Sequence, residues 1–525
     1  MKLIINKQIK KLVIFFPILI YLGKRSYLAY DSGFYALQAR WILSDNNWII
    51  PKWWNEYTLD RTIGIQYLIA KSQSIFGKNE LAAHIPTTLA AFLMIFLTYK
   101  LHEELVGKKG AIYSCLILST TYIWFDFAHQ GTQDMIFACL VTSGLYALTK
   151  IERNKQFIFH ILFGLWIGLA FMMKTFLIAV PLTGLIPAIF EKKKIINYGY
   201  FLIGLLIGFL PFIIWSLIIN QSLDNNIIFY LLSKFNTLSS KNTFTNPFYY
   251  YLWNIPINFL PWSIFSFLGF FVNYKLNKKN KILLCYFPII FVFLISIFST
   301  KTPYYALQIS SILSINSYTG IISVIHSKKL KPIFLFFISK VVPLLIISFI
   351  FIYFLLNSSI NLGLKEELHI LIGLILLSFS WLLINQVKNP KRIITLLILG
   401  PYLFTSLVIQ SGLFTDRSKN IRESMEKVIA LEDLNNKIIN VNTSDIVDNN
   451  THSKIIRIAL LTPNLGKGID NINKIKTVEL IWTTQSKFET LDSKLFKVIY
   501  QDKYLNPWIL VRKINYDSDL SDKIN

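Results

Sequence analysis

The stretch DSGFYALQAR (residues 31–40) follows the first hydrophobic segment of the chain and opens a long polar loop. A carboxylate leads it, and apolar residues then recur at helical spacing, at Phe34, Leu37 and Trp41. This spacing predicts a helix over residues 32–43 with one apolar stripe. Three tryptophans follow within a few residues, at positions 48, 53 and 54. Tryptophan is typical of the membrane–water interface, so we expect interfacial helices in this loop.

Asp31 has two interpretations. Its carboxylate can accept hydrogen bonds from the first backbone N–H groups of the helix, as an N-cap does. It can also be a catalytic base at the mouth of a membrane cavity, because ionisable groups at a membrane boundary are costly and mark functional sites. The two roles can coexist, and the spacing alone does not separate them.

The composition is that of a membrane protein. Of 525 residues, 54% are hydrophobic and only 16% are charged. Apolar runs such as 203–219, 282–297 and 333–356 approach the ~20 residues that cross ~30 Å of hydrocarbon. The fold class that we predict is an all-α polytopic membrane protein with a small exposed α/β domain at its C-terminal end.

The net charge of +24 does not indicate nucleic-acid binding. The lysines cluster in short loops between apolar runs, in every second loop. This is the positive-inside pattern that orients membrane proteins, so we expect a lipid bilayer and no nucleic acid as partner. The three cysteines, Cys115, Cys139 and Cys285, all fall inside predicted spans.

The alternation of basic and non-basic loops predicts about thirteen transmembrane helices, with the N-terminus cytoplasmic. The loops 31–78 and 220–254 and the C-terminal tail then share the outer face. The predicted spans are 12–30, 79–99, 110–127, 131–149, 157–173, 175–190, 197–219, 255–274, 282–299, 304–325, 333–356, 368–387 and 393–413.

Two domains are predicted. Residues 1–413 form the transmembrane domain, with the two long outer loops as a cap over the active site, and residues 414–525 form a soluble exoplasmic α/β domain. In the tail we expect a helix over 422–429 and strands over 437–441, 454–461, 477–482, 495–500 and 508–511. The glycine-rich stretch 464–468 lacks the spacing of a phosphate loop and reads as a turn.

Other ionisable residues lie at the predicted outer face. Asp134 begins a span and can cap it, or it can be a buried charge that needs a partner. Asp60 and Arg61 can be a surface ion pair, or Arg61 can bind a phosphate with its planar donors. Lys174 and Lys301 are single cations on outer turns, which favours an anionic ligand on that side. No His/Cys cluster has metal-ligand spacing, and no nucleophile triad is visible.

An ordered set of motifs resembles the integral-membrane glycosyltransferases that use polyprenyl-phosphate sugars, and among them the aminoarabinose (lipid A) transferase and protein O-mannosyltransferase group. These enzymes have the C-type glycosyltransferase fold. The motifs are DSGFYA (31–36), WIIP (48–51), LDR (59–61), TQDM (132–135), MK (173–174), PFYYY (247–251), FLPW (259–262), KTPYY (301–305) and DRS (416–418). They run in order over nearly the whole chain.

The resemblance implies Asp31 and Asp134 as catalytic carboxylates. It also implies an acid–cation pair at Asp60 and Arg61, and contacts to the donor phosphate or substrate at a further set of side chains: Lys174, Lys301, Tyr305 and Tyr35. The family commonly has Asp-Glu where this chain has Asp31-Ser32, and Glu-Lys-Pro-Pro in place of residues 60–63. No cofactor is required by the sequence. The carboxylate pair of the family implies a possible divalent metal site at Asp60 and Asp134.

We therefore expect an inverting glycosyltransferase of the inner membrane, acting on its outer, periplasmic face. It would move a sugar from a polyprenyl-phosphate donor to a glycolipid such as lipid A, a glycan or a protein. Two alternatives share the spans: a lipid or sugar transporter or flippase, and an outer-face polysaccharide polymerase or ligase. The first is less favoured because no internal repeat is visible, and the second because it would lack an aspartate directly after the first span.

Overall fold

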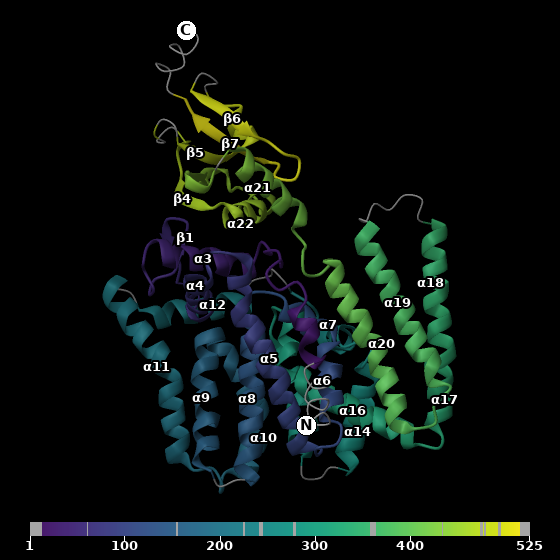
Figure 1. Cartoon of the computed structure of the whole chain (residues 1–525). Helices are drawn as coiled ribbons and strands as arrows, with labels where there is room; N and C mark the ends of the chain where they lie inside the picture. Colours follow the sequence, from purple (N-terminus) through teal and green to yellow (C-terminus); the bar gives the residue numbers. More distant parts are fainter. Residues whose placement is uncertain are drawn as a thin grey trace, which may run out of the picture. The chain divides into compact units, whose positions relative to one another are not determined.

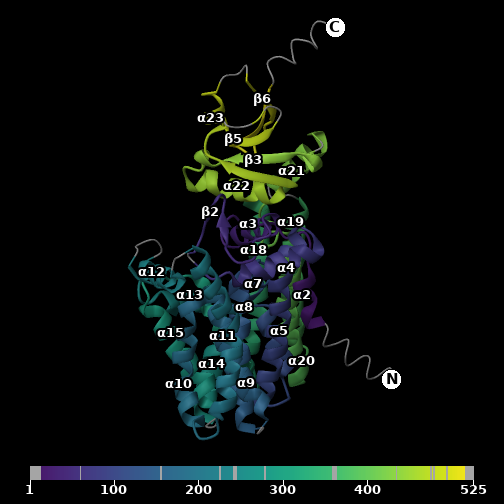
Figure 2. The ribbon, with the colours of Figure 1, turned by 90° about the vertical axis from the view of Figure 1, so that its left-hand side faces the viewer.

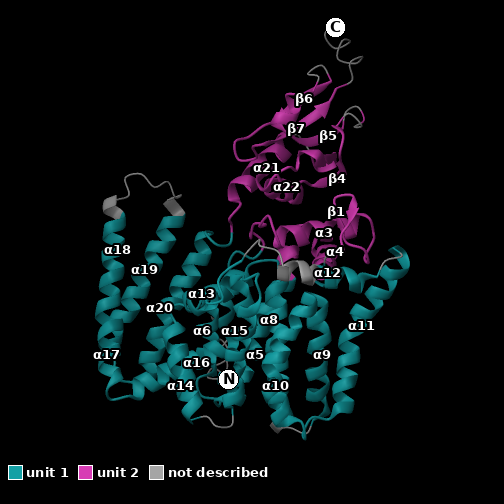
Figure 3. Cartoon of the chain, turned by 180° about the vertical axis from the view of Figure 1, so that it is seen from behind, with its two compact units in different colours: residues 1–22, 60–64, 86–415 teal, residues 23–59, 65–85, 416–525 magenta. Residues whose placement is uncertain are grey.

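The computed structural model describes residues 13–59, 61–153, 156–223, 226–240, 245–276, 280–356, 364–432, 434–472, 476, 479–491 and 495–514. They divide into two compact units (Figure 3). Unit 1 contains the segments 1–22, 60–64 and 86–415, and unit 2 contains 23–59, 65–85 and 416–525. The first outer loop thus clusters with the C-terminal tail. The predicted division at residue 413 remains a prediction.

Unit 1 is a bundle of long apolar helices (Figures 1 and 2). Most of its helices match a predicted span, and the short connecting helices are 3-10 (η2, η4) or π-helical (η3, η5). The elements are η1 (Val13–Phe15), α2 (Phe16–Leu19), α5 (Glu80–Leu105, whose first turn counts with unit 2), α6 (Ala111–Ser119), α7 (Tyr122–Ala128), α8 (Gln133–Arg153), α9 (Phe157–Lys174), η2 (Thr175–Ile178), α10 (Ala179–Lys192), α11 (Tyr198–Leu223), α12 (Ile227–Ser240), α13 (Tyr250–Asn258), α14 (Ser263–Leu276), η3 (Ile282–Tyr286), α15 (Phe287–Ile297), η4 (Pro303–Ile309), α16 (Ser310–His326), α17 (Leu330–Phe336), η5 (Phe337–Val341), α18 (Val342–Leu356), α19 (Leu364–Ile384) and α20 (Pro390–Ser411).

The predicted class of helical membrane protein is confirmed. Within the described residues, eight helices are long and apolar enough to cross a membrane, or up to ten if each of two bent pairs is one span. The bent pairs are α6 with α7, at 71°, and α13 with α14, at 109°. The number thirteen stays a prediction. The first span was predicted too long, because the helix ends at Leu19 and the chain turns at Gly23, whose φ is +92°.

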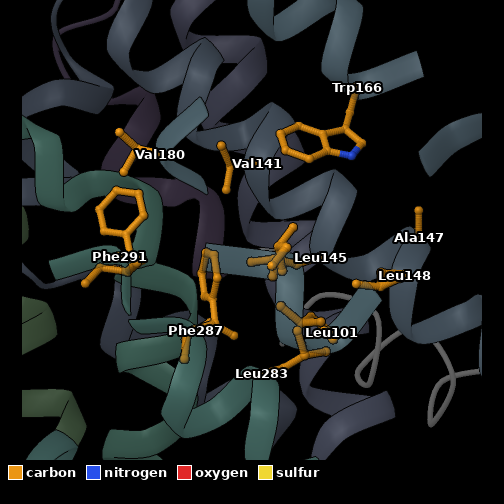
Figure 4. Close-up of a cluster of buried hydrophobic side chains, with 14 of the residues drawn as sticks. Leu101, Val141, Leu145, Ala147, Leu148, Trp166, Val180, Leu283, Phe287 and Phe291 are labelled. Carbon is orange, nitrogen blue, oxygen red and sulfur yellow. The ribbon is translucent and has the colours of Figure 1, made fainter. Parts of the chain in front are cut away.

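The core of unit 1 lies between helices that are distant in the sequence. Figure 4 shows Val141, Leu145 and Leu148 of α8 beside Phe287 and Phe291 of α15. Leu101, Trp166 and Val180, from three further helices, complete the cluster. Burial of such side chains is a main favourable term in folding.

Glycines let α9 and α11 approach closely. Gly164 and Gly168 face Gly204 and Gly208, and each of the two pairs has the four-residue spacing that is common at membrane helix interfaces. A Cβ added at Gly204 would lie 1.9 Å from the carbonyl oxygen of Ile161, and one at Gly168 would lie 2.2 Å from the carbonyl carbon of Gly208. No larger side chain fits this contact without moving the helices apart.

Unit 2 joins the first loop to the tail. Its sheet has the strand order β4-β3-β5-β7-β6, in which β3 is parallel to β4 and β5, and β7 is antiparallel to β5 and β6. The elements are α3 (Ser32–Ser44), β1 (Lys52–Trp53), β2 (Glu56–Tyr57), α4 (Gly64–Phe76, whose first residue counts with unit 1), α21 (Lys419–Glu432), η6 (Leu434–Asn436), β3 (Ile438–Asn442), η7 (Thr443–Asp445), α22 (Asn449–Leu461), β4 (Asn464–Ile469), β5 (Leu480–Thr484), α23 (Gln485–Phe488), β6 (Phe496–Tyr500) and β7 (Trp508–Lys513).

Two predictions for the tail are wrong. Residues 454–461 belong to helix α22, whose start is fixed by a capping box between Asp448 and Thr451. The apolar residues of 454–461 fit both the helical and the strand periodicity. The capping box at Asp448 favours the helix. The stretch 464–468 lies in strand β4, at the edge of the sheet, and is not a turn. The predicted helix 422–429 and the strands near 437, 477, 495 and 508 are confirmed within a few residues.

Candidate active site

Asp31 immediately precedes helix α3. It occupies the N-cap position, but its side chain makes no capping hydrogen bond. Tyr35 N–H instead donates to the backbone carbonyl of Asp31, at 2.9 Å. The N-cap interpretation of the carboxylate is therefore wrong in this structure, and the residue is exposed.

The backbone at Asp31 is unusual, because its φ is +53°. Few residues other than glycine adopt a positive φ, and those that do cluster at functional sites. Gly33 explains how the turn closes. A Cβ at this position would lie 2.1 Å from the carbonyl oxygen of Leu28 and 2.9 Å from a methyl carbon of Ile456. In the Asp-Ser-Gly motif, Asp31 is thus exposed at a turn in which position 33 has room only for glycine.

Helix α3 is anchored in unit 2 by Arg40. Its guanidinium donates to the carbonyls of Ala459 and Leu460, in the last turn of α22, and to those of Thr462 and Pro463, just after the helix, at 2.7–3.0 Å. A helix leaves its last carbonyls without partners, and a cation there is stabilising. Burial lowers the pKa of Arg40. The predicted helix 32–43 is confirmed. Most of its residues are buried, so the apolar stripe of Phe34, Leu37 and Trp41 is not its only buried face.

Aromatic side chains pack along one side of α3. The rings of Phe34 and Trp53 stack with their centroids 4.2 Å apart, and Trp41 meets the edge of Trp53 at 5.7 Å. Tyr35 is only 1% exposed. It is part of the packing of unit 2, and its role in substrate binding remains a prediction.

Asp134 has a basic partner that the sequence did not reveal. Its carboxylate forms a salt bridge with Lys174, and the two side chains are 5% and 7% exposed. Helices α8 and α9 therefore bring together residues 40 positions apart. The Lys174 ammonium also lies 4.7 Å from the centroid of the Tyr304 ring and 5.7 Å from that of Tyr305. Three of the predicted residues thus form one group, the ion pair with Tyr305.

Lys301 is placed differently. Its ammonium donates to two backbone carbonyls, those of Asn246 at 2.8 Å and Phe298 at 2.6 Å. It is 5% exposed, and burial lowers its pKa. Since an ammonium has three donors, at most one is left for a phosphate. In this structure Lys301 connects the second outer loop to the turn before η4.

Arg61 lies in the short segment that leads into α4, within unit 1. Asp60 lies outside the described residues. Asp31 and Tyr35 belong to unit 2, whereas Arg61, Asp134, Lys174, Lys301 and Tyr305 belong to unit 1. The predicted convergence of the cations beside Asp31 therefore remains a prediction.

The described residues offer no metal site. No group of three or more His, Cys, Asp or Glu side chains among them could hold an ion. The carboxylate of Asp134 is engaged by Lys174, and a cation beside a metal ligand opposes metal binding. The ion pair of Asp134 with Lys174 does not support the predicted metal at Asp60 and Asp134.

Sequence reasoning missed Gln308, one turn beyond Tyr305 in η4. It is 1% exposed, and neither atom of its amide has a hydrogen-bond partner. Gln308 and Tyr305 line a narrow apolar pocket with Phe137 and Leu177. These two residues follow Asp134 and Lys174 by three positions each, so the pocket adjoins the ion pair. A lone glutamine after the KTPYY motif is the only sequence signal for it.

Comparison with known proteins supports a relationship. Residues 60–215 match the family described as dolichyl-phosphate-mannose-protein mannosyltransferase. The chain is 25% identical over 291 residues to an undecaprenyl phosphate-alpha-4-amino-4-deoxy-L-arabinose arabinosyl transferase of Proteus mirabilis, covering 53% of this chain and 52% of that protein. The corresponding transferase of Photorhabdus laumondii is 24% identical over the same shares. The chain thus spans about half the length of these curated relatives.

The fold is shared over almost the full length with a solved structure. ArnT from Cupriavidus metallidurans, bound to undecaprenyl phosphate, superposes with a TM-score of 0.77 at 14% identity, covering 97% of this chain and 98% of that one. Its apo structure gives a TM-score of 0.76. These comparisons confirm the resemblance to membrane glycosyltransferases that the ordered motifs indicated.

Proposed function

We propose that this chain, a relative of the polyprenyl-phosphate-sugar glycosyltransferases, is an inverting transferase. It moves a sugar from a polyprenyl-phosphate donor to the hydroxyl or phosphate of an acceptor, which is a lipid A-like glycolipid, a glycan or a protein. The observation that carries the proposal is the shared fold with an undecaprenyl-phosphate-bound transferase over 97% of the chain. Asp31 supports it, because its carboxylate makes no cap bond and its own backbone has a positive φ.

The chemistry requires a base and a stabilised leaving group. The Asp31 carboxylate takes the proton of the acceptor hydroxyl while the acceptor oxygen attacks the anomeric carbon. The bond from that carbon to the phosphate oxygen breaks, and its electron pair leaves with the polyprenyl phosphate. Attack in one step inverts the anomeric centre.

Cations should stabilise the negative charge that grows on the leaving phosphate. We assign this part to Lys174 and Arg61, with a hydrogen bond from Tyr305. Because Lys174 is held by Asp134 in this structure, a bound phosphate would have to share or replace that carboxylate. Asp134 then positions Lys174 rather than taking the proton. Lys301, with two of its donors already used, contributes mainly to the shape of the site.

The protein is an integral membrane protein, and we place it in the inner membrane. The N-terminus would be cytoplasmic, and the tail and both long loops periplasmic. The basic loops support this orientation, since positive residues are retained on the cytoplasmic side.

The test is transfer of a labelled sugar by purified full-length protein. A synthetic undecaprenyl-phosphate sugar is supplied with candidate acceptors, and the anomeric configuration of the product is read by NMR. We expect a product of inverted configuration and the release of undecaprenyl phosphate. A product that retains the configuration would refute the one-step mechanism. If undecaprenyl phosphate is released but no glycolipid, glycan or protein acceptor becomes glycosylated, the transferase is refuted.

A further inference from the structure

A charged residue lies deep in one of the apolar spans. Residues 330–353 form a span with a mean hydropathy of 2.6, and Lys340 is its eleventh residue. At 1.5 Å per residue it lies about 15 Å along the helix from Leu330, whereas the hydrocarbon core is about 30 Å thick. Lys329 and Lys331 mark the basic end of the helix. The ammonium of Lys340 is thus well inside the apolar layer, and its four-carbon stem cannot span that depth.

No carboxylate of the described chain neutralises Lys340. It takes part in no salt bridge among the described residues, and its recorded neighbour is the ring of Phe336, at 5.8 Å. Its side chain is exposed on the outside of the bundle. An ionisable residue inside a span is rare, costly and functional by default.

The surface around Lys340 is apolar and uncovered. Only 11% of this span is buried within the chain, compared with 78% of the α8 span. Figures 1 and 3 show α17 and α18 at the edge of unit 1, with α19 as their neighbour. Large exposed side chains recur along this span at alternating sequence steps of four and three residues: Ile333 (59% exposed), Phe337 (53%), Leu344 (64%), Ile347 (50%) and Phe351 (64%). Phe336, Leu345, Phe349 and Ile352 are exposed as well. Lys340 falls in step between Phe337 and Leu344.

This spacing is that of packed helices. Steps of three and four define the seam along which two helices interlock, and a single polar residue in the seam fixes partner and register. Polar side chains hold membrane helices together because an unpaired one is costly in hydrocarbon. Lys340 also lies in the π-helical turn η5, and π turns occur often at functional sites.

We propose that this stripe (Ile333, Phe337, Lys340, Leu344, Ile347 and Phe351) is the docking surface for a transmembrane helix of another membrane protein. That helix carries an Asp or Glu at the depth of Lys340. A second copy of this chain does not fit, because the described carboxylates on its own apolar helices all lie within about a turn of a helix end. The two nearest the core, Asp126 and Asp134, are 7% and 3% exposed.

The experiment is site-specific photo-crosslinking of the full chain in native membranes. A photoreactive residue replaces Leu344 on the stripe, or Ile375 on α19 as an exposed control position. We expect one protein adduct from position 344 and none of the same mass from 375. The captured protein, identified by mass spectrometry, should contain Asp or Glu inside an apolar span. Lys340→Met should remove at least nine-tenths of the adduct, and Lys340→Arg should retain it.

A charge exchange completes the test. Lys340→Glu should abolish the adduct, and changing the partner's carboxylate to lysine should restore it. The proposal is overturned if position 344 gives only lipid adducts or none, if Lys340→Met leaves the adduct unchanged, or if the captured span has no carboxylate. Sugar transfer by purified Lys340→Met protein should equal that of the wild type, which shows that the variant folds. If the docking proposal fails, the proposed transferase function is not affected.

Discussion

At the scale of single residues, two carboxylates and two lysines of the candidate site have different surroundings. Asp31 and Asp134 both precede or begin a helix, yet one is exposed at a strained turn and the other is buried in an ion pair. Lys174 and Lys301 are both lone outer cations in the sequence. One contacts a carboxylate and two aromatic rings, and the other binds backbone carbonyls. Their expected roles differ accordingly.

Replacing Asp31 by Asn should lower sugar transfer about 10²–10⁴-fold, the usual contribution of a general base. The fold should be retained, because Asn, like Asp, tolerates a positive φ. Turnover is measured in purified protein, with thermal unfolding as the check on folding. Asp45→Asn, at the other end of α3, removes only a surface ion pair with Lys52 and should leave transfer unchanged. Near-normal turnover of the Asp31 variant would exclude it as the base.

Gln308→Met should raise the melting temperature of the protein. A buried amide without partners costs about 1–3 kcal/mol, and methionine fills a similar volume without that cost. The matched control is Gln38→Met. Gln38 is equally buried, but its amide oxygen accepts a hydrogen bond from Gln66 at 2.9 Å, so this change should destabilise. Equal destabilisation by both changes would show that the Gln308 amide has a partner in solution.

At the scale of elements, buried ionic contacts connect helices that are far apart in the sequence. Within unit 1, Asp134 and Lys174 join α8 to α9. Within unit 2, Arg40 of α3 donates to carbonyls at the end of α22, and Arg422 of α21 pairs with Glu80, at the start of α5, at 3.7 Å. Breaking a buried pair leaves an uncompensated charge, which costs far more than the pair contributes.

A double-mutant cycle should reveal the coupling of Asp134 and Lys174. Asp134→Asn and Lys174→Met should each destabilise the protein by about 3–5 kcal/mol, because each leaves one buried charge alone. The double variant should lose much less than the sum, since no charge remains. Unfolding in mixed detergent micelles measures all four forms. Additive losses would mean that the two side chains do not interact.

Arg40→Lys should destabilise unit 2, although it keeps the charge. An ammonium has three donors and no planar fork, so it cannot bind all four carbonyls in and just after the last turn of α22. Each abandoned carbonyl costs about 1–3 kcal/mol. Protease resistance of the tail during heating reports the change. Arg392→Lys, an exposed position on α20, is the control and should be neutral.

At the scale of the whole molecule, the chain alternates between apolar helices and exposed segments, and this alternation sets its topology. A reporter enzyme that is active only in the periplasm should be active when it is fused at Asn525, and inactive when it is fused after Lys193. The reason is that lysine-rich loops stay on the cytoplasmic side. Activity of the Lys193 fusion with silence at Asn525 would invert the topology and remove the basis of the proposed site.

The sequence by itself determined the features that depend on local pattern. Long apolar runs predict the helices of unit 1, since only continuous hydrophobicity fits the membrane. The spacing after Asp31 predicts α3, and alternation predicts β3 and β5–β7. At 454–461 the apolar residues fit the strand and the helical periodicity equally, and the predicted strand was wrong. The side-chain capping bond of Asp448 favours the helix there.

Only the tertiary structure decided which distant groups meet. The partner of Asp134 is 40 positions away, and the carbonyls that Arg40 binds are more than 400 positions away. The turn at Asp31 and the unpaired amide of Gln308 likewise depend on surroundings that no spacing encodes. The physical reason is that periodicity records which face of an element is apolar. The pairing of buried charges and hydrogen bonds is fixed only when the elements pack together.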